Sequence, residues 1–399
     1  MIPSDMKDEM RQVLEENILH FWLTKMVDET HGGFYGRMDG QDRLIEDAPK
    51  GAVLNARILW AFSAAYRVLG KEAYRKMAVR AKDYFLAHFI DREQGGVYWM
   101  LDCKGNPIDT KKQTYAIGFA IYGLSEFYRA TGDDEALQMA IRLYRDIEKH
   151  AFDPVNNGYI EALTQDWQPI EDMRLSDKDE NGSFTMNTHL HILEPYTNLL
   201  RVWPDEGLRD RLRNLIDIFV THILNTNTFH LDLFFDNHWQ GRRDKVSCGH
   251  DIEAAWLLTE ALDVLNDQAL TEALMPTIHL IAQAAEEGIQ PDGSLCETTG
   301  KESARGDRVW WVQCECIIGE VDQWQHSGDA RNLDRAKHCW NYVRQHLIDW
   351  KNGEWLWSVR EDGSANRDDD KAGPWKCPYH NTRACLEISV RLSTYIAVR

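Results

Sequence analysis

Hydrophobic and polar positions along this chain alternate between two kinds of helical stretch. In the first kind, apolar residues recur at helical spacing on one face and charged residues occupy the other, as Leu137, Ile141 and Tyr144 do against Arg142 and Glu148. This pattern predicts a half-buried helix. We expect such helices over residues 8–27, 72–90, 134–152, 206–224, 270–289 and 330–349.

The second kind of stretch is apolar nearly all round. Val53, Leu54, Ile58, Leu59 and Trp60 together cover every direction of one such helix. A helix without a polar face is buried inside the protein. We expect buried helices over residues 51–68, 114–130, 188–203, 251–265, 309–325 and 381–397.

A short strand signal, rich in glycine and aromatic residues, precedes each buried helix. It begins at positions separated by 63, 62, 76, 59 and 60 residues, namely Gly33, Gly96, Gly158, Phe234, Gly293 and Gly353. A fixed period of this kind indicates a repeat architecture. The turn after the buried helix recurs as well, at Gly70, Gly132, Pro204, Asn266 and Gly328, and glycine or asparagine there suits a left-handed C-terminal cap.

Six repeats of one buried and one covering helix predict an all-α fold. We expect an (α/α)6 barrel of twelve helices, six inner and six outer, with short β-hairpins at one end, formed by residues 1–399 as a single domain. An open superhelix is the alternative. Closure is favoured because the second apolar face of each inner helix needs partners across an axis. Segment 163–187 is the main insertion and is expected to form a surface loop near the site.

Charge and cysteine content narrow the possible partners. The net charge of −19 argues against nucleic acid, which needs clustered Lys and Arg. No apolar run reaches the ~18 residues of a membrane span, and the acidic N-terminus is unlike a signal peptide. The eight cysteines form no CxxC pair, which indicates free thiols. We therefore expect a cytoplasmic protein that is a monomer or a weak homodimer, without a membrane or nucleic-acid partner.

Polar residues interrupt the buried helices near their N-terminal ends. They occupy similar phases of six repeats, so a closed ring would deliver them to one pocket. These residues are Arg57, Tyr115, His191 with Glu194, His250 with Glu253, Trp311 with Glu315, and His380 with Asn381 and Arg383.

Three of these repeats contribute a histidine. A lone buried histidine is usually a structural residue that has found a partner, which is the interpretation for His189 and His279. Titratable groups gathered in a cleft favour catalysis instead, and we interpret His191, His250 and His380 in this way.

The carboxylates beside these histidines have a predicted role. Glu194 and Glu253 each follow a histidine by three residues, on the same helical face. A carboxylate beside an imidazole raises the pKa of the imidazole and can fix its tautomer, although a plain structural ion pair is the alternative.

Common cofactor and metal motifs are absent from the sequence. There is no HExxH, no GxGxxG after a strand, no GxxxxGK[ST] and no GxSxG. Several histidines, an arginine and tryptophan platforms suit proton abstraction beside a carbonyl, as in a ring-opened reducing sugar. We therefore expect an enzyme that uses neither cofactor nor metal. The tryptophans near the repeat junctions could stack on sugar rings or belong to the core, and they are Trp99, Trp310, Trp311, Trp357 and Trp375.

At these positions the sequence resembles the N-acylglucosamine 2-epimerase superfamily, and within it the cellobiose 2-epimerase branch, over essentially the whole chain. The stretches that carry the resemblance are residues 50–60, 95–99, 185–194, 249–254, 308–315 and 373–381. Segment 163–187 matches least.

The resemblance implies an (α/α)6 barrel and an isomerase that needs no cofactor. It would reversibly epimerise C2 of the reducing-end glucose in β-1,4-linked disaccharides, converting cellobiose to glucosyl-mannose and lactose to epilactose through a cis-enediolate. By resemblance, His250 and His380 are the acid/base pair, and His191 assists ring opening. The same resemblance assigns Arg57 to the enediolate oxygens and Asn187, Glu253, Trp311 and Trp375 to the sugar, while Tyr115, Trp310 and Glu315 complete the expected binding set.

Three other functions stay open at this point. A mannose isomerase, another aldose–ketose isomerase or an N-acylglucosamine 2-epimerase of the same superfamily would use the same histidines. A glycoside hydrolase on the same barrel would need two carboxylates flanking the bond, drawn from Glu194, Glu253 and Glu315. A sugar-binding protein without catalysis would not depend on the histidines.

Overall fold

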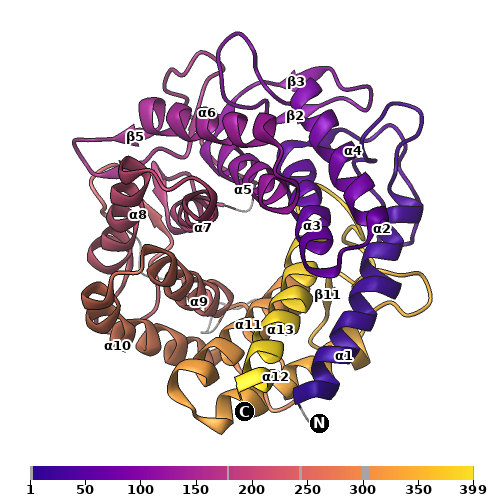
Figure 1. The fold of residues 1–399 in the computed structure, drawn as a ribbon, viewed down its shortest axis with the longest axis vertical. Coiled ribbons are helices and arrows are strands. Elements are labelled where there is room, and N and C mark those ends of the chain that lie inside the picture. The colour runs from indigo at the N-terminus through magenta and orange to yellow at the C-terminus, as the bar shows by residue number, and fades with distance from the viewer. Residues whose placement is uncertain (1–2, 178, 242–244, 299–305, 399) are drawn as a thin grey trace.

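The computed structural model describes residues 3–177, 179–241, 245–298 and 306–398, and within these residues two concentric sets of six helices form a barrel (Figure 1). The inner set surrounds the axis and consists of α3 (Ala52–Leu69), α5 (Thr114–Thr131), α7 (Met186–Val202), α9 (Cys248–Leu265), α11 (Trp310–Ser327) and α13 (Tyr379–Val398).

The outer set covers the inner one. It consists of α1 (Pro3–Val13) with its continuation η1 (Leu14–Leu19) and α2 (His20–Lys25), α4 (Glu72–His88), α6 (Asp134–His150), α8 (Glu206–Ile218) with η2 (Phe219–Ile223), α10 (Gln268–Ala285) with η3 (Glu286–Gly288), and α12 (Ala330–Tyr342) with η4 (Val343–Leu347). The outer helices α4, α6, α8, α10 and α12 each pack on the inner helix that precedes them in the chain, and α1 packs on α13. No helix of the described segments is both long enough and apolar enough to cross a membrane.

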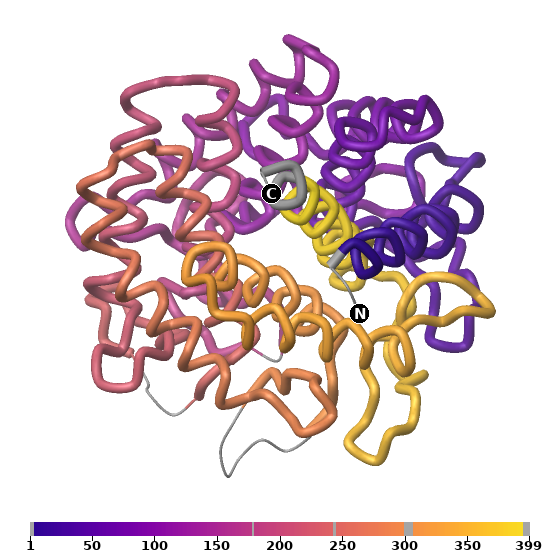
Figure 2. Tube along the Cα trace, turned by 60° about the horizontal axis from the view of Figure 1, so that its bottom comes forward, coloured from indigo at the N-terminus to yellow at the C-terminus, as the bar shows by residue number. Residues whose placement is uncertain are grey.

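The barrel is a closed ring rather than an open superhelix. Every inner helix contacts the next, and α13 returns to contact α3. The N-terminal helix α1 packs against α13, so the first and last helices of the barrel lie side by side (Figure 2). The predicted closure is therefore confirmed.

Helix caps set where the elements begin and end. The helices α3, α5 and α11 end at Gly70, Gly132 and Gly328, which are left-handed, and α9 ends at left-handed Asn266. The helix α9 begins at Cys248, three residues earlier than the hydrophobic pattern predicts, because the side chain of Ser247 caps it.

A tight turn follows each outer helix, as the strand signals predict. Backbone bridges close these turns at Val27–Phe34, Ile90–Val97, Phe152–Tyr159, Leu224–Leu231, Ile289–Leu295 and Ile348–Trp355. The fourth signal, at Phe234 and Phe235, does form a strand, β9. This strand pairs with β8 (Phe184–Thr185) and does not close the turn after η2, so the aromatic pair marks a different strand of the repeat from the other signals.

Short strands tie neighbouring repeats together at one end of the barrel. Each tie joins the residues just before an inner helix to a hairpin of the next repeat, and Met38 bridges Ala372 to join the first repeat to the last. The strands of these ties are β1 (Lys50–Gly51) with β2 (Met100–Leu101) and β3 (Pro107–Asp109), β4 (Lys112–Gln113) with β7 (Ala162–Leu163), β8 with β9, and β10 (Arg308–Val309) with β11 (Ser358–Val359). The pair β5 (Phe152–Asp153) and β6 (Gly158–Tyr159) closes the turn after α6. The N-terminal ends of the inner helices are thereby held at this end.

Buried lysines brace these hairpins. Lys50 Nζ lies 2.7 Å from Asp28 Oδ2, and Lys112 Nζ lies 2.7 Å from Asp91 Oδ2, with all four side chains inaccessible to solvent. Asp91 also accepts backbone N–H groups of its own turn. Burial lowers the pKa of Lys50 and Lys112, while the aspartates partly offset this effect. Each pair fixes a turn to the start of an inner helix.

Glycines allow the inner helices to approach closely. A Cβ atom on Gly118 of α5 would lie 2.4 Å from the backbone oxygen of His191 in α7. A Cβ atom on Gly319 of α11 would lie 2.4 Å from Ile252 Cγ1 in α9. Both distances are far below van der Waals contact, so a larger residue would push neighbouring helices apart.

We predict that Lys112→Met destabilises the protein by about 3–5 kcal/mol, because it leaves the carboxylate of Asp91 buried without a cation. The measurement is the free energy of unfolding in urea. The matched control is Arg75→Met, which breaks the exposed pair with Glu72 and should leave that free energy unchanged. Equal effects of the two substitutions would contradict a bracing role for Lys112.

Candidate active site

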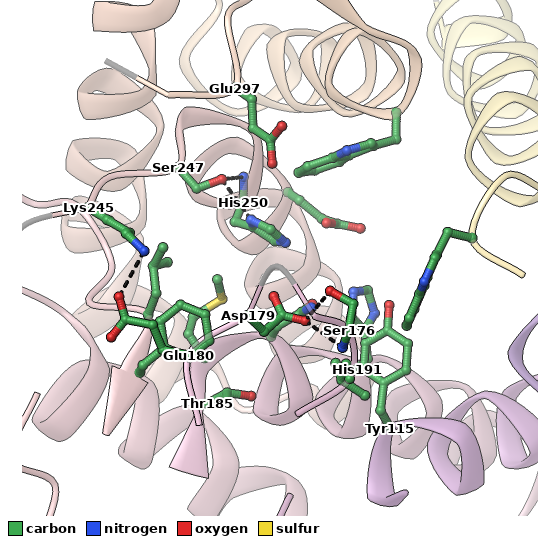
Figure 3. A pocket seen from close by; sticks show the side chains of 18 of the residues that line it. Tyr115, Ser176, Asp179, Glu180, Thr185, His191, Lys245, Ser247, His250 and Glu297 are labelled. Atoms are coloured by element: carbon green, nitrogen blue, oxygen red, sulfur yellow. Dashed lines mark hydrogen bonds and ion pairs between the residues drawn. The ribbon is translucent and has the colours of Figure 1, made fainter. Parts of the chain in front are cut away.

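A cavity of about 810 Å³ lies at the hairpin end of the barrel. Its wall is built from the first turns of the inner helices and from the loops before them (Figure 3). The lining includes most of the predicted site residues, namely Arg57, Tyr115, Asn187, His191, His250, Glu253, Trp310, Trp311, Trp375 and His380.

The three candidate histidines come from different inner helices and meet on this cavity. His191 lies on α7, His250 on α9 and His380 on α13. The ring of Trp311 lies against two of them, with centroids 4.7 Å from His250 and 5.7 Å from His380. The ring of Tyr115 packs against His191 at 5.0 Å. Equivalent phases of the repeat thus bring distant residues to one place.

His191 is held from behind by a carboxylate on its own helix. Its Nδ1 lies 3.0 Å from Glu194 Oε2, as the three-residue spacing predicts. The other oxygen of Glu194 accepts hydrogen bonds from Tyr379 and Arg383. Burial raises the pKa of Glu194, but Arg383 and His191 outweigh it and bring that pKa to about 2. Glu194 therefore stays ionised and accepts the proton-bearing Nδ1 of His191.

His380 is held in a similar way by Glu315. Its Nδ1 lies 2.7 Å from Glu315 Oε1, which also accepts Arg383 Nη2 at 2.7 Å. The second oxygen of Glu315 accepts Trp256 Nε1 at 3.0 Å. Glu315 was expected to hold the sugar beside Trp311, but it is fully buried behind His380 and its oxygens are occupied. The helical phase of Trp311 and Glu315 on one helix did not show that only Trp311 would line the cavity.

His250 has a hydroxyl rather than a carboxylate behind it. Ser247 Oγ lies 2.7 Å from His250 Nδ1 (Figure 3). The sequence predicted that Glu253 would hold His250, which is wrong: Glu253 Oε1 accepts Arg383 Nη2 at 2.6 Å instead. Sequence reasoning missed Ser247 because it started this helix at residue 251. The cap spacing of a serine three residues before the histidine was the available signal.

Arg383 is the cation that joins these carboxylates. Its guanidinium hydrogen-bonds to Glu194, Glu253 and Glu315 and is 1% exposed. Within the described residues, Glu253, Glu315 and His380 have the geometry of a metal-ion site. The Nη2 atom of Arg383 bonds to both of those carboxylates, so a positive charge already lies at this position.

Burial shapes the protonation of the cavity. It lowers the pKa of His250 to about 3 and lowers the pKa of His380 well below its ordinary value, so both imidazoles are neutral at neutral pH and able to accept a proton. Burial, together with nearby Glu315, raises the pKa of Glu253 to about 7. Arg383 offsets the burial of these carboxyl groups unequally, and Glu253 is left with a pKa near neutrality.

Three buried polar atoms of the lining find no hydrogen-bond partner among the described residues. They are Arg57 Nε, Asn187 Oδ1 and Trp310 Nε1. Arg57 is held in place by its other groups: Nη2 donates to the Tyr115 hydroxyl at 2.8 Å, and the guanidinium lies 4.1 Å from the centre of the Phe119 ring. Buried polar groups are normally satisfied, so these atoms are suited to hydroxyl or carbonyl oxygens of a ligand.

The insertion of the third repeat lies beside the cavity, as expected of segment 163–187. Its residues Arg174, Leu175, Ser176, Asp179 and Glu180 contribute to the lining. Glu180 pairs with Lys245 at 2.8 Å, which ties the insertion to the loop before α9 (Figure 3). The excess length of this repeat was the only sequence signal for these residues.

The two histidines interpreted as structural lie outside the cavity lining. His189 donates through Nδ1 to the Thr185 carbonyl and accepts the Tyr159 N–H at Nε2, so both of its nitrogens are satisfied. His279, on the outer helix α10, hydrogen-bonds to Gln323 of the inner helix α11. Their structural interpretation is confirmed.

Known proteins resemble this chain over almost its whole length. The family model described as N-acylglucosamine 2-epimerase matches residues 33–384. A cellobiose 2-epimerase of Bacteroides fragilis is 56% identical over 387 residues, which is 96% of this chain and 98% of the relative. A cellobiose 2-epimerase of Ruminococcus albus is 40% identical over 97% of this chain and 99% of its own. The solved cellobiose 2-epimerase of Bacillus thermoamylovorans superimposes with a TM-score of 0.92 at 42% identity, covering 97% of this chain and 100% of that one.

We predict that His250→Gln weakens the loss of stability in acid. The pKa of His250 is about 3 in the folded protein and about 6.5 in the unfolded chain, so between these values only the unfolded chain takes up the proton. The folded state therefore loses about 2 kcal/mol between about pH 8 and about pH 5, a loss that the variant lacks. Urea unfolding at both pH values measures this difference. The exposed His20→Gln variant is the control and should follow the wild type.

Proposed function

The chain belongs to the N-acylglucosamine 2-epimerase family, and from this membership we propose that the three cavity histidines carry out C2 epimerisation of cellobiose. The enzyme is an isomerase that converts the reducing-end glucose of the disaccharide to mannose and back. The observation that carries the residue assignment is the meeting of three imidazoles, from three separate inner helices, on one buried cavity.

The chemistry begins with an open-chain sugar whose C1 carbonyl makes the C2 proton acidic. His250 and His380 are the acid/base pair on opposite sides of C2: one removes the proton and the other supplies one to the opposite face. Their neutral state supports this role, because only a neutral imidazole accepts a proton. The intermediate is a planar cis-enediolate, and protonation on the face opposite to the one that lost its proton inverts C2. The permanent charge of Arg57 stabilises the developing negative oxygens.

Other lining residues bind the sugar or help to open it. His191, with Glu194 at Nδ1, assists opening and closure of the ring. Asn187 and Glu253 contact the hydroxyl groups, Trp310, Trp311 and Trp375 offer flat apolar faces, and Tyr115 positions Arg57. Glu315 acts through His380 rather than on the sugar.

The arrangement of the carboxylates argues against a glycoside hydrolase. Such an enzyme needs two carboxyl groups on opposite sides of the scissile bond, about 5–10 Å apart. Here Glu194, Glu253 and Glu315 converge on one guanidinium instead. An aldose–ketose isomerase would use the same histidines and differ only in protonating C1, so product analysis separates it from the epimerase.

We also propose a cytoplasmic location, no cofactor, and a monomer or weak homodimer. All eight cysteines are free thiols, seven of them buried, which supports a reducing compartment. The permanent charges of Arg57 and Arg383 supply the electrostatic stabilisation that a metal would otherwise provide.

We predict that epimerisation of cellobiose in heavy water places deuterium at C2 of the mannose unit, because the proton removed by histidine exchanges with solvent before the return step. Proton NMR of the isolated disaccharides measures this. A ketose as the main product would favour the isomerase instead, and release of free glucose would favour a hydrolase. Lactose, mannose and N-acetylglucosamine assayed in parallel define the substrate range.

We predict that His380→Ala and His250→Ala each lower kcat by about 10²–10⁴-fold, the usual contribution of one acid–base group, while KM changes little. His191→Ala should also be slower, with its larger effect on ring opening. The control is His279→Ala on the outer layer, which should keep wild-type kcat. Activity that survives in either His380→Ala or His250→Ala would contradict the acid/base assignment.

A further inference from the structure

The three cavity histidines differ in the group that faces Nδ1. His191 and His380 each have a carboxylate there, Glu194 and Glu315. His250 has the hydroxyl of Ser247 (Figure 3). An ionised carboxylate only accepts hydrogen bonds, whereas a hydroxyl also donates one. The three imidazoles therefore need not carry their proton on the same nitrogen.

Glu315 settles the tautomer of His380. Its oxygens accept Arg383 Nη2 and Trp256 Nε1, so the carboxyl group is surrounded by donors. The remaining contact, from His380 Nδ1, completes this set as an N–H donor. Neutral His380 therefore has a bare Nε2, the ring nitrogen on the side away from Glu315.

Hydrogen counting at Ser247 gives the opposite result for His250. Ser247 caps α9, and its Oγ accepts the backbone N–H of His250 at 3.4 Å. The side chain is only 3% exposed, so its hydroxyl hydrogen needs an acceptor inside the protein. The acceptor that the described residues offer is the Nδ1 lone pair of His250, 2.7 Å away. The proton of neutral His250 then lies on Nε2.

We propose that Ser247 is a positioning residue that fixes neutral His250 as the tautomer protonated on Nε2, so that His250 meets the sugar as a hydrogen-bond donor while His380 meets it as the base. The inference rests on the proposed function for its catalytic meaning. It deepens that function by dividing the two steps between the members of the pair.

The first step follows from this division. The bare Nε2 of His380 takes the C2 proton, the electron pair of the C2–H bond becomes the C1–C2 double bond, and the carbonyl π pair moves onto O1. His380 becomes an imidazolium whose charge faces Glu315, and neutral His250 donates its Nε2–H to the enediolate. In the return step His250 transfers its Nε2 proton to the opposite face of C2, the C1–C2 π pair becomes the new C2–H bond, and the electron pair on O1 re-forms the carbonyl. Nδ1 of His250 gains one proton from solvent, once the Ser247 hydroxyl turns to accept that N–H, and His380 releases the original C2 proton to solvent, so the protons balance.

A cap alone does not require this contact. Thr185 caps α7 at the equivalent place, and its hydroxyl donates to Glu161 rather than to a histidine.

Substitutions separate the capping role of Ser247 from its contact with His250. Ser247→Asp keeps an acceptor for the helix N-terminus but offers Nδ1 a carboxylate, whereas Ser247→Thr keeps the hydroxyl. Asp205→Ala removes the cap of α8, away from the cavity, and controls for lost capping.

The direct test is the tautomer of His250 in the resting enzyme. Two-bond ¹⁵N–¹H correlation spectra of the full chain with ¹⁵N-labelled histidine show which ring nitrogen carries the proton, and the signal missing from His250→Gln identifies the residue. We expect the proton on Nε2 in the wild type and in Ser247→Thr, and on Nδ1 in Ser247→Asp. A wild-type His250 protonated on Nδ1 would overturn the proposal.

Kinetics with cellobiose test its consequence. Ser247→Asp should lower kcat by about 10²-fold, at the low end of what one positioned acid–base group contributes, with KM little changed. Ser247→Thr should recover most of this loss, and Asp205→Ala should keep wild-type kcat. Equal kcat in Ser247→Asp and the wild type would defeat the proposal. A wild type that does not epimerise cellobiose would defeat the proposed function, whereas the spectra need no substrate and judge the tautomer separately.

Discussion

The inner helices are apolar on every side, and the closed ring follows from this constraint. An inner helix that is covered by an outer partner on one side still has an apolar face, and the neighbouring inner helices and the axis are what bury it. Closure then has a consequence for the polar residues. Side chains at the same phase of each repeat point to the same end and the same axis, so residues almost two hundred positions apart, such as His191 and His380, share one cavity.

The protein also buries charged groups, which is energetically costly. Arg383 lies inside the barrel with three carboxyl groups, two of which stand directly behind His191 and His380. Removing ions from water is expensive, and only mutual pairing keeps such a cluster in place. The cluster therefore connects packing to chemistry: one guanidinium orients three carboxyl groups, and two of them, Glu194 and Glu315, each orient an imidazole. The buried Lys50 and Lys112 pairs do the same for the hairpins that carry the site.

The two histidines of the proposed acid/base pair, His250 and His380, have different partners at Nδ1. His380 faces a carboxylate that stabilises its charged form, and His250 faces a hydroxyl that can donate or accept. Burial holds both of them neutral in the resting protein. In the proposed mechanism His380 takes up the C2 proton and becomes positively charged, whereas His250 donates a proton at Nε2 and accepts one at Nδ1. A carboxylate at Nδ1 of His380 and a hydroxyl at Nδ1 of His250 suit these two roles.

The sequence by itself determined the repeat, the two classes of helix and the set of cavity histidines, because periodicity and burial pattern are local properties of the chain. It also located the helix ends at Gly70, Gly132 and Gly328, where backbone chemistry is local. Only the tertiary structure decided the partners. It showed that Ser247 rather than Glu253 contacts His250, that Glu315 lies behind His380, and that Phe234 pairs with a distant strand. The contacts of Glu315 and Phe234 depend on how segments far apart in the chain meet in space, which spacing along one helix does not specify. Ser247 and Glu253 both lie three residues from His250, and it is Arg383, from another helix, that takes Glu253 and leaves Ser247 as the partner.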